Sequence, residues 1–476
     1  MAPTTDTPIS LNRAFEAAVE CPDEVVLNVA GTMPDGLRGT LYRNGPSRWE
    51  AGGFWGGHAF DGDGLVSKFV IDGGEVRFRS RYVRTPKFIA EERDRGARVR
   101  GLYTQASGIL ANAGRPPADS ANTHAVVHAR RLLALSDVGR PWEIDLDDLR
   151  TVGRCDFGGK LPRSSRFSAH PKIDPATGEM FNFGLDVTVG RRTPAGLRCF
   201  RVDPSGRLHR IGTIGLDHVV VQHDFAITER YLVFALAPLV VDPVRAGLAV
   251  LGRGTYGDAA DYRPEKGMQI VLVPRDGGRH RIVECDPFLY VHVDNAYDER
   301  GDVVLDVVCH DSLAFLTSGL KSFRDGLPPV GRPARVRITK SGHVERTIIG
   351  EFESVEFPMH DERRTGRPHR FSYFAAYHPE TSGAIVKFDH RTGRERRHVF
   401  LGGEFPGEPI FVPRSKTAAE DDGWILAITY LAAEHCTALV VLDATDIERE
   451  PLAIARMTGH VFPGFHGSFT DDVAGR

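Results

Sequence analysis

The sequence has few cysteines, and no two of them have the CxxC spacing. Its six cysteines lie far apart along 476 residues, at positions 21, 155, 199, 285, 309 and 436. This spacing indicates neither a cysteine-rich zinc site nor a thioredoxin-type redox pair. We therefore expect free thiols and an intracellular protein, because disulfides are rare in reducing compartments.

The sequence also lacks an excess of charge of one sign and long apolar runs. Its 60 Lys and Arg residues nearly balance 63 Asp and Glu residues, so we expect no nucleic acid as a partner. No apolar run reaches the ~18 residues of a membrane-spanning helix. The N-terminus has no basic segment followed by an apolar one, as a signal peptide would. These features predict a cytoplasmic protein.

Glycine and proline are abundant, with 51 and 30 residues, and they separate many short apolar runs. Turn signals such as Asp72-Gly73-Gly74 stand between the runs, which is typical of a large antiparallel β protein. Helices are expected only at Leu11–Glu20 and Pro243–Leu251. The expected strands are Val26–Val29, Gly39–Arg43, Val66–Ile71, Val76–Val83, Ala125–Leu135, Ile211–Ile214, Tyr231–Leu236, Gln269–Val273, Asp302–Val308, Val336–Thr339, Ile385–Phe388, Trp424–Tyr430 and Ala438–Asp443.

No clean linker divides the chain, which favours a single all-β domain over residues 1–476. Many short strands in one unit favour a barrel or a propeller. A propeller of seven blades would use roughly 60 to 70 residues per blade, which suits this length. No internal sequence repeat sets the number of blades.

Four histidines stand in apolar, small or turn-forming surroundings. The segment Phe167–Gly184 reads as strand, turn, strand around His170, and similar surroundings recur at His223, His292 and His466. A single histidine of this kind is more often structural than functional. The intervals of 53, 69 and 174 residues approximate one, one and two or three blades. Histidines at equivalent positions of different blades would point towards one axis and could share a metal ion.

Neutral imidazoles suit iron, zinc, copper and nickel, so the ligand type leaves the metal open. Acidic residues in buried-looking turns, namely Asp137, Glu356 and Glu408, could accept the outward N–H of such ligands. Each of them, considered singly, is more often a turn or capping residue. The remaining histidines that stand among charges and turns are expected to be exposed; these are His209, His280, His343, His369, His390 and His398.

Several longer motifs occur in the order found in one known family. They are GTLYRNGP at 39–46, HAFDGDGLV at 58–66, TQASGILANA at 104–113, ANT at 121–123, LLALSDVGRPWEID at 132–145, EFP at 356–358, GEPIFVPR at 407–414 and EDDGW at 420–424. With the four histidine segments, these motifs make the chain resemble the carotenoid cleavage oxygenases over nearly its whole length. That family includes apocarotenoid, lignostilbene and visual-cycle retinoid enzymes.

The resemblance implies a seven-bladed β-propeller with a dome of helices and loops over the metal-bearing face. It implies non-haem Fe(II) held by His170, His223, His292 and His466. It also implies supporting acids at Asp137, Glu356 and Glu408, and a threonine, Thr123, near the open coordination position. The family usually has Glu at position 137, and Asp is one methylene shorter. We therefore expect its direct contact with a ligand imidazole to be lost or bridged by water.

The activity implied is a dioxygenase reaction in which O2 is added across one C=C bond to give two carbonyl products. A carotenoid or apocarotenoid is the favoured substrate, and a phenolic stilbene or phenylpropene is the alternative. In stilbene-cleaving members a Lys occupies the position of Ser136, and a Tyr upstream matches Tyr103; we take both residues as substrate contacts. A propeller used only for binding would have little reason to keep four histidines with Glu356 and Glu408.

The segment 234–251 (FALAPLVVDPVRAGLAVL) allows two interpretations. It fits a blade strand followed by a buried helix. It also fits a peripheral contact with a membrane beside the mouth of the substrate tunnel, because Asp242 and Arg245 interrupt its apolar residues and suit shallow docking better than insertion.

Overall fold

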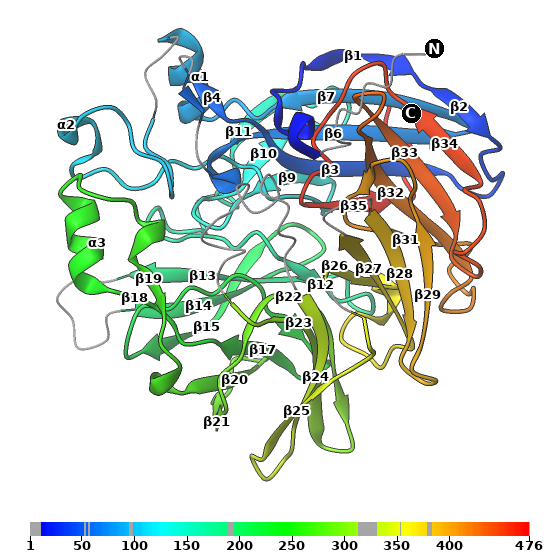
Figure 1. Ribbon diagram of the computed structural model, residues 1–476. Coiled ribbons are helices and arrows are strands. Elements are labelled where there is room, and N and C mark those ends of the chain that lie inside the picture. The colour runs from blue at the N-terminus through cyan, green and yellow to red at the C-terminus, as the bar shows by residue number, and fades with distance from the viewer. Residues whose placement is uncertain are drawn as a thin grey trace, which may run out of the picture.

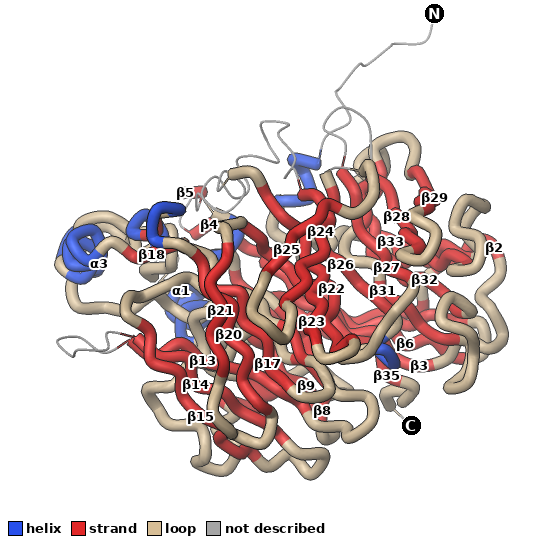
Figure 2. The backbone as a smooth tube through the Cα atoms, turned by 90° about the horizontal axis from the view of Figure 1, so that it is seen from below, coloured by secondary structure: helices blue, strands red, loops and turns tan. Residues whose placement is uncertain are grey.

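The computed structural model describes residues 11–51, 54–55, 58–94, 99–187, 195–312, 331–352, 354–377 and 383–475. Within these residues, antiparallel sheets surround a common axis and account for nearly the whole body (Figures 1 and 2). The chain is a β-propeller, as its sequence predicts. Helices are few and short, because Gly, Pro and Asp turns recur after almost every apolar run.

Seven units can be followed in the sheet order of the described residues, each beginning with a strand next to the axis. From the axis outwards they are β35 (His466–Thr470), β3 (Gly39–Arg48), β6 (Asp63–Asp72), β7 (Glu75–Tyr82) and β1 (Cys21–Val26); β8 (His124–His128), β9 (Arg131–Leu135), β10 (Trp142–Ile144) and β11 (Thr151–Arg154); β12 (Lys172–Ile173), β13 (Met180–Val187), β14 (Ala195–Val202) and β15 (Leu208–Leu216); β16 (Ala226–Ile227), β17 (Tyr231–Leu236), β20 (Met268–Pro274) and β21 (Arg281–Cys285); β22 (Leu289–Glu299), β23 (Asp302–His310), β24 (Gly331–Ile338) and β25 (Val344–Ile348); β26 (Val355–His360), β27 (Phe371–Tyr377), β28 (Gly383–Asp389) and β29 (Arg394–Val399); and β31 (Ile410–Pro413), β32 (Gly423–Leu431), β33 (Cys436–Asp443), β34 (Ala453–Arg456) and β2 (Asn28–Gly31).

The remaining elements connect these blades. The helices are α1 (Pro86–Arg93), α2 (Ile109–Asn112) and α3 (Pro243–Val250), and short 3₁₀ turns lie at Leu11–Phe15, Ala59–Asp61, Gly257–Ala259, Pro264–Lys266 and Glu362–Arg364. Small pairs are formed by β4 (Glu50–Ala51) with β5 (Phe54–Trp55) and by β18 (Leu239–Val241) with β19 (Ala260–Tyr262), while β30 (Glu404–Pro406) pairs with β32. Figure 1 places α2 and α3 side by side at one edge, and the Gly114 amide donates to the Val250 carbonyl there at 2.7 Å.

The two ends of the chain close the ring of blades. Near the C-terminus, β35 pairs with β3, while near the N-terminus β2 pairs with β34. A single parallel bridge from His466 to His124 joins β35 to the next blade. Residues from both ends are therefore needed to complete the first and last blades.

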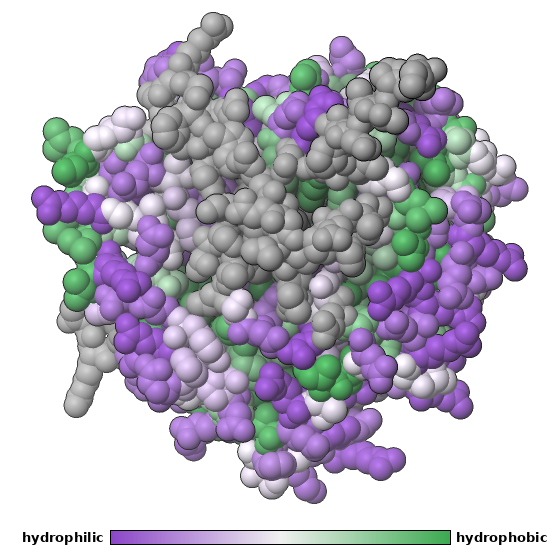
Figure 3. All heavy atoms as spheres, in the orientation of Figure 1, coloured by the Kyte–Doolittle hydropathy of each residue, from purple (hydrophilic) through white to green (hydrophobic). Residues whose placement is uncertain are grey.

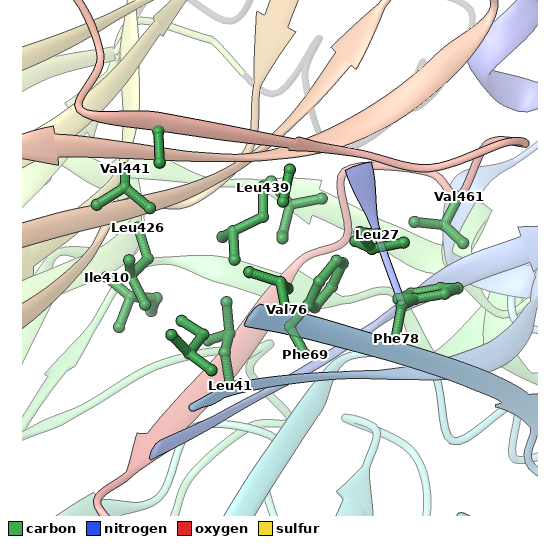
Figure 4. Close-up of a cluster of buried hydrophobic side chains, with 14 of the residues drawn as sticks. Leu27, Leu41, Phe69, Val76, Phe78, Ile410, Leu426, Leu439, Val441 and Val461 are labelled. Carbon is green, nitrogen blue, oxygen red and sulfur yellow. The ribbon is translucent and has the colours of Figure 1, made fainter. Parts of the chain in front are cut away.

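The largest hydrophobic cluster seals this closure. Phe69 and Phe78 of the first blade pack with Leu426, Leu439 and Val441 of the last (Figure 4). Along β7, Phe78 alternates with more exposed residues, whereas β6, β32 and β33 are buried along nearly their whole length, as expected for sheets covered on both faces. Burial of this cluster holds the ring shut by the hydrophobic effect.

Four local expectations were wrong, each because tertiary contacts prevail. The strand expected at Val26–Val29 is divided between β1 and β2, which belong to the first and the last blade. The helix expected at Leu11–Glu20 is a 3₁₀ turn that ends at Phe15, since the Ala18 amide donates to Ser47 of β3 instead. The strand expected at Ala125–Leu135 is two strands, joined by a tight turn in which Ala129 and Arg130 have φ of +50° and +58°. The first strand of Phe167–Gly184 is β12, which follows His170 rather than preceding it.

Helix α3 is confirmed within one residue of its expected end. Pro243 stands in its first turn, and the Asp242 carboxylate accepts from the amides of Val244 and Arg245, each at 2.9 Å. These are the two features that start a helix in water-exposed sequence. No helix among the described residues has the length and apolar content needed to span a membrane.

The packing between the first and last blades leads to a prediction about stability. Replacing the fully buried Phe69 by Ala should lower the free energy of unfolding by about 3–5 kcal/mol, because the cavity left between the first and last blades cannot collapse. Urea denaturation followed by intrinsic fluorescence would measure it. Val152→Ala on β11, where the side chain is 64% exposed, is the control and should change the value by less than about 0.5 kcal/mol. Equal effects of the two changes would contradict the role of this cluster.

Candidate metal centre

The structure brings the four predicted histidines together on the propeller axis. His170 and His223 lie just before β12 and β16, His292 lies within β22, and His466 begins β35. The Nε2 atom of His223 lies 3.0 Å from that of His170 and 3.3 Å from that of His292. The Nε2 atoms of His292 and His466 are 3.2 Å apart. Each innermost strand thus carries its histidine to the same level of the axis.

These distances suit a shared metal ion. Ligand bonds of about 2.1 Å that meet at right angles place two nitrogens about 3.0 Å apart. In three of the four rings, the Nδ1–H faces a carboxylate, so the neutral ring presents an unshared pair at Nε2. Lone pairs at such distances repel one another unless a cation lies between them. The donor set therefore fits a metal ion that prefers imidazole.

The three predicted acids stand directly behind three of the histidines. Asp137 Oδ2 accepts from His223 Nδ1 at 2.6 Å, and Glu356 Oε2 accepts from His292 Nδ1 at 2.5 Å. Glu408 Oε1 accepts from His466 Nδ1 at 2.7 Å. Such contacts fix the ring orientation and raise the basicity of the ligand nitrogen.

The contact of Asp137 corrects one expectation. The shorter side chain reaches His223 directly, without the loss or the bridging water that its missing methylene suggested. The preceding residue explains this position, because the Ser136 hydroxyl donates to Asp119 at 2.6 Å and the Trp142 indole donates to the same carboxylate at 2.9 Å. Asp119 therefore holds the turn after β9 against the axis.

Two further residues support these acids. Glu356 Oε1 lies 2.6 Å from His310 Nε2, and the buried Arg43 guanidinium forms a close ion pair with Glu408. Although burial opposes its charge, His292 and His310 hold the pKa of Glu356 far below its usual range. Arg43 lies in the GTLYRNGP motif, whereas no motif marks His310.

His170 differs from the other three rings. Its Nδ1 lies 4.0 Å from Asp224 Oδ1, and that carboxylate is paired with Lys172 at 2.9 Å. Burial and the neighbouring histidines hold the pKa of His170 well below its usual value. Burial, together with His292, does the same for His466. For His223, burial also opposes the charge, but Asp137 outweighs it and raises the pKa.

A fifth histidine, His124, lies on the axis and was not predicted. Its ring nitrogens face backbone carbonyls, with Nδ1 2.9 Å from Ala169 O and Nε2 3.3 Å from Gly467 O. Its ring therefore bonds to the backbone rather than pointing its free nitrogen at the other four.

Two histidines expected to be exposed are buried instead. His369 and His390 gather around Asp294, with His369 Nε2 3.2 Å from Asp294 Oδ2. Asn295 donates to His369 Nδ1 at 3.3 Å and Arg335 donates to His390 Nδ1 at 3.0 Å, so both protons stand on Nε2. This group fits a self-satisfied polar network rather than a metal site. Its members come from β22, β24, the residue after β28 and the segment before β27, so spacing along the chain could not reveal it.

Two neighbouring cavities lie on the side of the histidines that faces the helices. A small one of about 60 Å³ is lined by Thr123, Ser136, Phe357, His223, His292 and His466. A larger one of about 880 Å³ reaches His223 and is lined mainly by aliphatic side chains from β13, β17, β18 and α3. Both are lined by Phe60, Leu102 and Asp137, so they share a wall beside the histidines.

The two predicted substrate contacts, Tyr103 and Ser136, line different cavities. Tyr103 lines the larger cavity and stacks on His58, with ring centroids 3.8 Å apart. Ser136 lines the smaller one, but its hydroxyl donates to Asp119. Thr123 is 8% exposed, and its hydroxyl donates to Asn122 at 3.2 Å.

Comparisons with known proteins agree with this geometry. The family model described as retinal pigment epithelial membrane protein matches residues 14–471. The chain is 35% identical to apocarotenoid-15,15'-oxygenase of Synechocystis, covering 96% of this chain and 95% of that protein. It is 30% identical to lignostilbene-α,β-dioxygenase isozyme III of Sphingomonas paucimobilis, covering 94% of each. The crystal structure of cobalt-substituted Synechocystis ACO superposes with a TM-score of 0.89 at 32% identity, covering 97% of this chain and 98% of that one.

The carboxylates make a prediction about metal affinity. Glu356→Gln should weaken binding of a divalent metal about 10–100-fold, because the amide presents a poorer acceptor to His292 and breaks the pairing with His310. Competition with a chelator, with bound metal measured by mass spectrometry, would test it. Glu345→Gln on the exposed strand β25 is the matched control. An affinity equal to that of the control would contradict the supporting role of Glu356.

Proposed function

Because the chain belongs to the carotenoid cleavage oxygenase family, described by the model of retinal pigment epithelial membrane protein, we propose that it cleaves one C=C bond of a carotenoid or apocarotenoid with O2. The products are two carbonyl compounds. Four residues are proposed to hold a single Fe(II) ion, and these are His170, His223, His292 and His466.

The convergence of four Nε2 atoms supports this metal site. Iron and cobalt both accept imidazole ligands, and a cobalt-substituted form of the Synechocystis relative exists as a crystal structure. When bound, ferrous iron supplies the one-electron chemistry that O2 needs to react with an alkene. Since both oxygen atoms end in the products, no external reductant is required.

The chain's own residues orient the imidazoles and enclose the substrate. Asp137, Glu356 and Glu408 hold three of the imidazoles in the tautomer that leaves Nε2 free. We assign to Thr123 the restriction of access to one side of the metal, because it lines the 60 Å³ cavity next to His292 and His466. No residue need act as a general acid or base. The remaining task is to place one double bond beside the histidines and keep water away.

The single observation that carries the substrate class is the large cavity. At about 880 Å³ it lies at the upper end of the range for small-molecule sites. Its walls include Val220, Leu239, Val241 and Leu289, which suit a long apolar polyene. Burial of such a chain is driven by the hydrophobic effect and requires few polar contacts.

Phenolic stilbenes and phenylpropenes are the alternative, because relatives named for lignostilbene and isoeugenol share this fold. A phenol would need a polar clamp for its hydroxyl group. Position 136 is a serine whose hydroxyl is engaged by Asp119, so Tyr103 would have to bind the phenol without a lysine beside it. This favours the polyene.

The metal assignment predicts the behaviour of one variant. His223→Ala should abolish both bound iron and cleavage, since it removes a ligand whose Nε2 lies within 3.3 Å of two others. Metal content by mass spectrometry and product formation would be measured together. His343→Ala at an exposed turn is the control. Cleavage retained in the His223 variant would overturn the assignment.

The substrate assignment is tested by direct competition. Iron-loaded protein is incubated in air with an apocarotenal and, separately, with a hydroxystilbene, and the products are identified by mass. We expect two carbonyl products from the apocarotenal at a kcat/KM at least about tenfold higher, because only the longer substrate fills the apolar cavity. Products from the stilbene alone would replace the polyene with the phenol.

A peripheral membrane contact completes the proposal, since a polyene dissolves in a bilayer rather than in water. Ile109 and Leu110 of α2 lie beside Val244, Leu248 and Leu251 at α3, and all five side chains are exposed. Hydrophobic residues gather at this edge in Figure 3, where Figure 1 places α2 and α3. Within residues 234–251, Phe234–Leu236 are buried blade residues as expected, but the expected buried helix is wrong, because only Ala249 of α3 is buried. The outer face of α3 is therefore open to a membrane surface.

Liposome flotation would test this contact. Leu110→Glu should reduce binding to phosphatidylcholine–phosphatidylglycerol vesicles about tenfold or more, since the side chain is 89% exposed and would otherwise enter the acyl region. Val152→Glu on β11 is the control for an added charge elsewhere. A wild-type protein that fails to bind the vesicles would disprove the membrane contact.

A further inference from the structure

A third cavity, of about 320 Å³, lies on the opposite side of the four histidines. It is lined by residues that follow the histidines along the innermost strands, such as Lys172, Asp294 and Ser468. The substrate-side cavities are lined by residues that precede them, such as Val291 and Phe465. Because these strands run along the axis, the histidines divide one axial space from the other.

This axial cavity runs from solvent to the metal centre. Its inner end is formed by the buried rings of His170, His292 and His466. Its outer end includes Pro175 and Glu362, both of which are exposed. A hydrated ion in this cavity would therefore reach the histidines from the side opposite the substrate cavities, without crossing the substrate-binding space.

The walls of the axial cavity carry mostly negative charge. Four acids line it, namely Asp224, Asp294, Glu362 and Glu408. Three of them are already paired: Asp224 with Lys172, Asp294 with a group of histidines, and Glu408 with Arg43 and His466. Among the described residues, the lining contains one Arg besides Lys172, and this residue, Arg363, is paired with Asp361.

Glu362 is different from these acids. Within the residues that the structure describes, its carboxylate has no hydrogen bond and no ion pair, and the residue is exposed. Three further acids line the same cavity, so the field there favours a cation over a second anion.

The substrate side offers a poorer path for an ion. The large cavity has mainly aliphatic walls. Taking a divalent ion out of water into such surroundings costs many kcal/mol unless ligands replace the hydration shell. Carboxylates and waters along the axial cavity can replace it stepwise.

We infer that the axial cavity is the route by which a divalent metal ion reaches the four histidines, and that Glu362 at its mouth is the first residue to bind that ion. This inference rests on the metal site of the proposed function and concerns uptake of the ion, not the reaction. In the first step, a hydrated divalent cation binds a single carboxylate in a region of negative potential.

Metal uptake in real time tests the route. Metal-free protein, prepared by dialysis against a chelator, is mixed with Co²⁺, and binding is followed by the visible absorbance of the coordinated ion. Glu362→Gln should lower the rate constant of uptake about tenfold or more, since it removes an unpaired carboxylate at the mouth of the axial cavity. Ile173→Trp, which narrows the axial cavity, should also slow uptake. The final metal content should equal that of the wild type in both.

Two controls separate this route from general effects. Glu345→Gln removes a distant carboxylate, and Val187→Trp narrows the substrate-side cavity instead. Both should take up Co²⁺ at the wild-type rate, and circular dichroism verifies that each variant is folded. Glu362→Asp should restore most of the rate.

Each outcome has one meaning. A wild-type rate in Ile173→Trp, or slow uptake in Val187→Trp, overturns the axial route. A wild-type rate in Glu362→Gln overturns the role of that carboxylate. If the wild-type protein takes up no stoichiometric Co²⁺, the proposed metal site fails and not merely the route to it.

Discussion

Four imidazole nitrogens that face one another at 3.0–3.3 Å are the constraint on which the rest of the structure depends. Three of these rings direct Nδ1 at a carboxylate, so their Nε2 lone pairs face one another and a cation between them removes the repulsion. The rings must also be kept neutral and fixed in direction, which is why Asp137, Glu356 and Glu408 stand behind three of them. Much of the buried polar chemistry near the axis, such as Arg43 and His310, serves those three carboxylates.

The propeller satisfies this constraint through its symmetry. Each innermost strand approaches the axis in the same way, so one residue from each of four blades reaches the same level. The residues before that level line an apolar cavity, and those after it line a polar one. One ring of histidines thus separates a space suited to an alkene from a space suited to water and ions.

How much the sequence could predict depended on the kind of interaction. The four histidines and three acids were identified from motifs, and the structure brings all seven together. Asp137 was expected to fall short of His223, yet it makes direct contact, because Asp119 draws the preceding turn towards the axis. That anchor lies 18 residues away from Asp137 and carries no motif of its own, so reasoning about side-chain length alone could not find it.

The sequence by itself determined the β class, the short helices and the residues that carry the chemistry, because turn residues and apolar alternation act locally. Only the tertiary structure decided which polar groups meet. His369 stands among charges in the sequence, yet it is buried against Asp294 because four separate elements converge there. The sequence likewise could not show that different cavities lie on the two sides of the four histidines. The propeller axis exists only after the last blade has closed on the first. Burial and convergence are properties of the folded chain, and they decide whether a histidine is a solvated side chain, a member of a polar network or a ligand.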